Sequence, residues 1–195
     1  MVAERQTSDG RSFQAAIAPR FAPRRVEGPW AVSFTPGWGA PAQASLPKLI
    51  SWTEHSDPGI RFYSGTAKYR ARFRVDANAA DAGPLRLDLG EVREIAQVWV
   101  NGRDLGVVWK RPFTVDLTGA IEDGTIKAGW NELEVAVTNL WPNRIIGDQS
   151  LPPEKRLTHT NIAKFHADSP LLPSGLLGPV VVESEAEGPL APGSF

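Results

Sequence analysis

The pair Asn101-Gly102 constrains the fold of this 195-residue chain more than any other feature. Strand-forming residues precede the pair from Ile95 to Val100, and a second apolar run follows it from Leu105 to Trp109. Asn and Gly tolerate the positive φ angles of a type I′ turn, which joins two antiparallel strands through only two residues. The sequence therefore predicts a β-hairpin here, and with it an antiparallel sheet.

Three further segments, 66–75, 85–89 and 133–138, alternate apolar and polar residues with a period of two. In the first of them the polar positions are basic: Lys68, Arg70, Arg72 and Arg74. This alternation is typical of antiparallel sheets with one buried and one wet face. We therefore expect an all-β antiparallel sandwich of jelly-roll type. Its inward-facing residues are predicted to be Tyr69, Phe73, Leu87, Leu89, Val98, Val100, Leu133, Val135 and Val137.

The rest of the chain is punctuated by 17 prolines and 18 glycines, so no helix of normal length is expected. Residues 116–121 allow one helical turn between strands, and residues 140–178 are predicted to be a long irregular segment. The predicted organisation is a linker or remnant of a preceding segment over 1–27, a β-sandwich carbohydrate-binding domain over 28–184, and a flexible tail over 185–195.

Composition narrows the classes of partner. The formal net charge of -1 provides no overall positive field for phosphates, so nucleic acid is not expected as a partner. No apolar run reaches the length of a membrane-spanning helix, so no membrane partner is expected either. The lack of cysteine excludes disulfides and cysteine-based zinc sites. The compartment is not fixed by these features, and an extracellular or periplasmic location is favoured.

A set of ordered motifs carries a family resemblance that runs from about Trp30 to Val182. The earlier motifs are the segments 63–69, 87–92, 112–116 and 129–135, together with the hairpin. In this order they resemble the sugar-binding, galactose-binding-like domain of glycoside hydrolase family 2. Two later motifs, 139–148 and 174–179, resemble more narrowly the C-terminal β-sandwich of family 106 α-L-rhamnosidase-like proteins. The resemblance implies a sandwich that accompanies a catalytic barrel.

Catalytic chemistry is hard to find in the sequence. A glycosidase needs two carboxyl groups about 5 to 9 Å apart, and no spacing singles out such a pair. The resemblance places the catalytic carboxylates on a separate (β/α)8 barrel, which 195 residues of this pattern do not contain. We therefore expect a non-catalytic carbohydrate-binding module related to a plant-polysaccharide-degrading glycoside hydrolase. The alternatives are a structural sandwich that packs on a glycosidase catalytic barrel without its own ligand, and a small stand-alone glycosidase.

Sugars are bound by aromatic faces and by planar polar side chains. Among seven tryptophans, Trp30 and Trp99 lie within strand patterns and are expected in the core. The segment 139–148 combines an aromatic ring, an amide, a guanidinium and a carboxylate. The predicted carbohydrate-binding residues are Trp141, Asn143, Arg144, Asp148, Trp52 and Trp109. The structural alternative is that Asp148 pairs with Arg144, that Trp141 covers the sandwich end, and that the segment docks on a neighbouring domain.

Two further possibilities concern charge and metal. The basic positions of 66–75 leave open an acidic polysaccharide such as pectin, but a solvated face paired with Glu132 and Glu134 is the favoured interpretation. No cofactor is predicted with certainty. A structural Ca²⁺ held by Asp57, Asp148 and Asp168 stays open, although no EF-hand spacing supports it.

Overall fold

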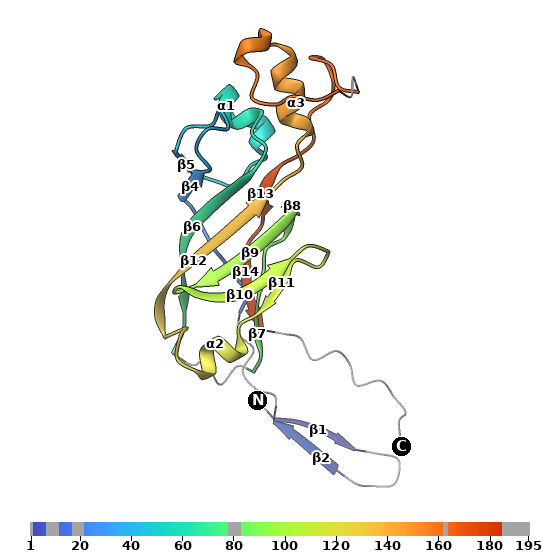
Figure 1. Ribbon diagram of the computed structural model, residues 1–195. Helices are drawn as coiled ribbons and strands as arrows, with labels where there is room; N and C mark the ends of the chain where they lie inside the picture. The colour runs from blue at the N-terminus through green and yellow to red at the C-terminus, as the bar shows by residue number, and fades with distance from the viewer. Residues whose placement is uncertain (1, 7–11, 17–21, 78–82, 162–163, 185–195) are drawn as a thin grey trace.

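The computed structural model describes residues 2–6, 12–16, 22–77, 83–161 and 164–184 (Figure 1). Most of its regular structure is antiparallel β-sheet, which confirms the predicted all-β sandwich. Before the sandwich, β1 (Val2–Gln6) and β2 (Ser12–Ala16) pair as an antiparallel hairpin. No helix of the described residues is long and apolar enough to cross a membrane.

Six strands form the larger sheet, in the order β10-β9-β12-β6-β4-β5. Their bounds are β4 Trp30–Phe34, β5 Gln43–Leu46, β6 Thr66–Val75, β9 Ile95–Val100, β10 Arg103–Val108 and β12 Gly129–Thr138. The ten residues of β6 pair with β12 along their whole length, whereas β4 pairs only with the first half of β6. Among the described residues, the second half of β6 therefore has no strand partner on the side away from β12.

Four strands form the smaller sheet, in the order β11-β7-β14-β3. Their bounds are β3 Arg24–Arg25, β7 Leu85–Asp88, β11 Thr114–Asp116 and β14 Val181–Ser184. A separate antiparallel pair joins β8 (Glu91–Arg93) to β13 (Gly175–Gly178). Strand β3 belongs to the smaller sheet although it precedes residue 28, the predicted start of the sandwich domain. Val26, which follows β3, is buried and donates its N–H to Val180 O at 2.9 Å.

The Asn-Gly hairpin is present as predicted. Asn101 and Gly102 join β9 to β10 with φ angles of 50° and 83°, as a type I′ turn requires. The return strand begins at Arg103, two residues earlier than expected, and a bulge lies between Asp104 and Gly106. The Asp104 carboxylate accepts the Gly106 N–H at 2.8 Å, which stabilises the bulge.

The core contains all nine residues predicted to face inward, each with an exposed fraction of 4% or less. Trp30 is buried with them, as expected. Trp99 is not in the core: it is half-buried on the opposite face of β9. The period of two explains this correction, because the burial of Val98 and Val100 turns the residue between them outward.

Helices gather mainly at the ends of the sandwich (Figure 1). At one end lie η1 (Trp52–Glu54), α1 (Pro58–Arg61), α3 (Pro142–Gln149) and η3 (Pro153–Lys155), and at the other lies α2 (Thr118–Glu122). The short α2 matches the single turn expected near residues 116–121. The expectation that 140–178 is irregular was wrong over α3 and over the strand β13. Helix α3 is only eight residues long and begins at a proline, a residue suited to a first helical turn. The predicted tail, 185–195, lies outside the described residues.

Candidate functional site

The segment 139–148 places its polar side chains inside the molecule rather than at a surface. Trp141, at the start of α3, is 73% exposed, but Asn143, Arg144 and Asp148 are buried. The Asn143 amide donates to Leu172 O at 2.7 Å and accepts the Leu172 N–H at 2.8 Å. These bonds tie α3 to the segment that leads into β13.

The charged residues of α3, Arg144 and Asp148, also make their contacts within the protein. Arg144 Nη2 lies 3.0 Å from Asp148 Oδ1. Asp148 Oδ2 accepts hydrogen bonds from the N–H groups of Leu157 and Thr158 at 3.1 and 2.8 Å, and from Thr158 Oγ1 at 2.6 Å. The carboxylate therefore holds the segment after α3 against the helix. For these three residues the geometry favours the structural alternative over contact with a sugar.

The other two predicted aromatic residues lie elsewhere. Trp52 is 1% exposed, stacks on Tyr69 with an interplanar angle of 8°, and meets Tyr63 edge to face. Its ring thus offers no free face to a sugar. Trp109, just after β10, is 67% exposed beside Lys110, whose Nζ lies 5.8 Å from its ring. The structure therefore brings together the α3 residues but not Trp52 and Trp109.

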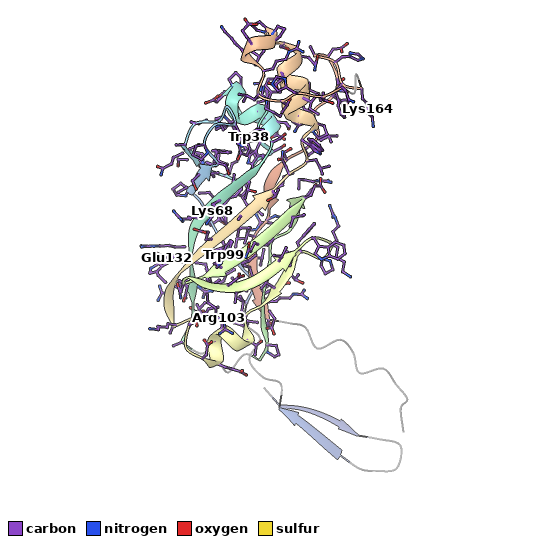
Figure 2. The ribbon with its side chains drawn as sticks, in the orientation of Figure 1. Trp38, Lys68, Trp99, Arg103, Glu132 and Lys164 are labelled. Carbon is purple, nitrogen blue, oxygen red and sulfur yellow. The ribbon has the colours of Figure 1, made fainter. Side chains whose placement is uncertain are left out.

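A hollow of about 1270 Å³ lies elsewhere, along the outward side of β6 and β12, and we call it the outer hollow. Its tryptophans are Trp99 of β9 and Trp130 of β12. The charged side chains that line it are Arg24, Arg25, Glu27, Lys68, Arg70, Arg72, Arg74, Glu132 and Glu134. Figure 2 shows Lys68, Trp99 and Glu132 on this side of the sheet. None of the six predicted carbohydrate-binding residues lines it, although its basic positions on β6 are those for which contact with an acidic polysaccharide was left open.

Most of the basic positions on β6 are paired across the sheet, as the favoured interpretation predicted. Glu134 accepts hydrogen bonds from Lys68 at 2.8 Å and from Arg70 at 2.6 Å, and Arg72 pairs with Glu132 at 3.1 Å. Burial alone would raise the pKa of the Glu134 carboxyl. Hydrogen bonds from the two cations, and their charges, outweigh that effect and hold its pKa below its usual value.

The two rings of the outer hollow differ in exposure. Trp130 is 68% exposed and lies opposite Arg74 in the β6–β12 register. Trp99 is half-buried, with Lys68 Nζ 5.2 Å from its ring. A signal for this surface was present in the sequence, because Trp130 precedes Glu132 and Glu134 at a spacing of two. The three side chains therefore share the wet face of one strand.

Two of the three carboxylates considered for Ca²⁺ are engaged within the protein, and the third, Asp168, is exposed. Asp57 caps α1 by accepting the Gly59 N–H at 2.7 Å, and Asp148 Oδ2 accepts hydrogen bonds from the Thr158 N–H and Oγ1 at 2.8 and 2.6 Å. Within the described ranges, no three His, Cys, Asp or Glu side chains come together in a group that could hold a metal ion.

Comparison with known proteins shows similarity to glycosidase-related proteins. A solved rhamnosidase from Novosphingobium sp. PP1Y is 38% identical, with a TM-score of 0.74 over 90% of this chain. A putative β-glucuronidase of Formosa agariphila is 36% identical over 82% of this chain. The chain spans only 16% and 15% of these two proteins. A β-glucuronidase structure from Ruminococcus gnavus, with 22% identity and a TM-score of 0.50, shares the fold alone. No protein-family model matches the chain.

Proposed function

We propose that this chain is a non-catalytic accessory domain of a glycosidase-related protein and that it binds carbohydrate in the outer hollow. The observation that carries the proposal is the exposed ring of Trp130 beside charged, planar side chains in one concavity. A flat indole stacks on the C–H face of a pyranose, and guanidinium and carboxylate groups bond pairs of neighbouring hydroxyls. The similarity to a rhamnosidase and a putative β-glucuronidase supports the ligand class.

The state of the carboxylates in the outer hollow supports a binding role without hydrolysis. A glycosidase needs one carboxyl group whose pKa is raised, so that it can donate a proton to the leaving oxygen. The pKa of Glu134 is lowered instead, and Glu132 is ion-paired with Arg72. Both groups are thus suited to accept hydrogen bonds from hydroxyls.

The three most exposed tryptophans, Trp109, Trp130 and Trp141, allow the location of binding to be tested. Open sites of this kind bind weakly, so we expect a Kd of roughly 10 µM to 1 mM for the best saccharide of a plant-polysaccharide panel. Trp130→Ala is expected to weaken binding by at least about fivefold, because it removes the stacking face. Titration calorimetry of Trp130→Ala, Trp109→Ala and Trp141→Ala measures this directly.

The two matched controls separate the outer hollow from the sites predicted from sequence. Trp109→Ala and Trp141→Ala remove rings of similar exposure elsewhere and are expected to leave the affinity unchanged. A loss of affinity in Trp141→Ala with normal binding by Trp130→Ala would move the site to α3. Absence of heat with every saccharide would contradict the proposed function.

A second candidate function is packing on the catalytic part of a larger glycosidase. The observation that favours it is a group of exposed apolar residues in or near the α3 end. They are Trp38, Leu140, Trp141, Leu157 and Leu172. Large exposed apolar patches commonly mark interaction surfaces. Binding of the chain to the catalytic part of a related glycosidase, lost in Trp141→Asp, would support this candidate when no saccharide binds.

A further inference from the structure

We propose that the carbohydrate bound in the outer hollow is acidic, with Arg25 and Arg74 pairing with its carboxylate or sulfate groups. This inference rests on the proposed function and specifies its ligand. The chain as a whole is nearly neutral, with a formal net charge of -1. The outer hollow is different, because six basic side chains line it against three acidic ones. The positive charge is therefore local to this surface.

The pairing pattern identifies the cations that are available to a ligand. Lys68 and Arg70 share an ion pair with Glu134, Arg72 pairs with Glu132, and Arg24 pairs with Asp76. Arg25 and Arg74 are exposed and have no ion-pair partner within the part of the chain that the structure describes. A solvated cation that carries no structural pair can bind an anion without first breaking an existing contact.

The position of Arg74 suits recognition of a charged sugar. It lies directly opposite Trp130 in the register of β6 and β12. A pyranose stacked on the indole would place its ring substituents toward the neighbouring strand. A guanidinium presents paired N–H donors that match the two oxygens of a carboxylate or sulfate. The ring and the cation thus form adjacent parts of one acidic-sugar site.

The inference is tested by comparing the affinities of acidic and neutral ligands. Trigalacturonate and its fully methyl-esterified form share the same rings and differ in charge, and a carrageenan oligosaccharide supplies sulfate in place of carboxylate. At low ionic strength we expect at least one acidic ligand to bind about tenfold more tightly than the neutral ester. The difference is expected to shrink with added salt, because the ion pairs are exposed to solvent.

Charge-matched variants assign the effect to residues. Arg25→Gln/Arg74→Gln is expected to lower the affinity for the acidic ligand about tenfold and to leave the ester unaffected. Lys155→Gln/Lys164→Gln removes the same net charge from exposed positions that do not line the outer hollow. This control is expected to bind like the wild type. Circular dichroism confirms that both variants remain folded.

Each outcome has a distinct meaning. Equal affinity for the acidic ligands and the ester overturns the inference and leaves the proposed function intact. Absence of binding to all three ligands and to the wider saccharide panel overturns both. Equal losses in the two double variants overturn the assignment to Arg25 and Arg74, because net charge alone would then explain the effect. Selective loss in Arg25→Gln/Arg74→Gln supports the inference, and the preferred ligand identifies carboxylate or sulfate as the anion.

Discussion

Tyr69 is the residue at which several distant segments meet. Its hydroxyl accepts hydrogen bonds from Trp52 Nε1 at 2.5 Å and from the Leu176 N–H at 3.1 Å. Gly175 passes so close that an added Cβ would lie 2.5 Å from the same hydroxyl, and its φ of 98° disfavours side chains. One phenol therefore fixes η1 and β13 against the centre of β6.

Tyr69 also predicts a specific alkaline sensitivity. Burial raises the pKa of its hydroxyl above the usual value of 10.0, so the unfolded chain loses this proton at lower pH than the folded one. The protonated Tyr69 hydroxyl therefore contributes fully to the free energy of unfolding below pH 10.0, and this contribution is lost as the pH rises above that value. Between about pH 10 and 11 the wild type should lose about 1 kcal/mol more unfolding free energy than Tyr69→Phe.

Urea unfolding of both proteins at pH 8 and at pH 11 measures this difference. At pH 8 the free energy of unfolding of Tyr69→Phe is expected to be about 1 to 3 kcal/mol lower than that of the wild type, because the buried N–H groups of Trp52 and Leu176 lose their acceptor. If the free energy of unfolding changes equally with pH in the wild type and in Tyr69→Phe, ionisation of Tyr69 does not contribute to the loss of stability at high pH.

At the scale of elements, α3 is held by a buried charged pair rather than by apolar packing alone. Asp148 combines the ion pair with Arg144 and three hydrogen bonds to the segment after the helix. Removing one member of a buried pair leaves the other charge without compensation. We therefore expect this carboxylate to matter for stability and not for sugar affinity.

Asp148→Asn tests the role of this pair. The unfolding free energy is expected to fall by about 3 kcal/mol, while the Kd for the best saccharide stays within about twofold of the wild type. Glu154→Gln, a similar loss of charge on the exposed surface of η3, is the control and should cost less than about 0.5 kcal/mol. Reduced sugar affinity in a folded Asp148→Asn protein would instead support the site predicted from sequence.

The sequence allowed prediction where one local rule decided the outcome. The type I′ turn and the inward-facing core followed from Asn101-Gly102 and from the period of two. The same period also predicts Trp99 on the wet face, whereas its hydrophobicity favours the core. Burial of Trp52 and Asp148 was not predictable, because it depends on tertiary packing: the Trp52 ring packs on Tyr69, and the segment after α3 folds back so that Leu157 and Thr158 cover Asp148. The outer hollow likewise requires the pairing of β6, β9 and β12.

For the whole molecule, the sandwich buries one side of the larger sheet in the core and exposes the other side, where the outer hollow lies. The buried tryptophans, Trp30 and Trp52, stabilise the core, whereas Trp99 and Trp130 line the outer hollow. Similarity to small portions of much longer glycosidase-related proteins is in keeping with such a division. The central claim is that saccharide binds beside Trp99 and Trp130.

Nuclear magnetic resonance of the indole N–H groups tests this claim most directly, because the seven tryptophans give one signal each. On titration with the best saccharide, the account predicts shifts in the Trp130 and Trp99 signals. The other five signals are expected to stay in place, and they belong to Trp30, Trp38, Trp52, Trp109 and Trp141. Shifts confined to Trp141 or Trp109, or no shift at saturating saccharide, would contradict the account.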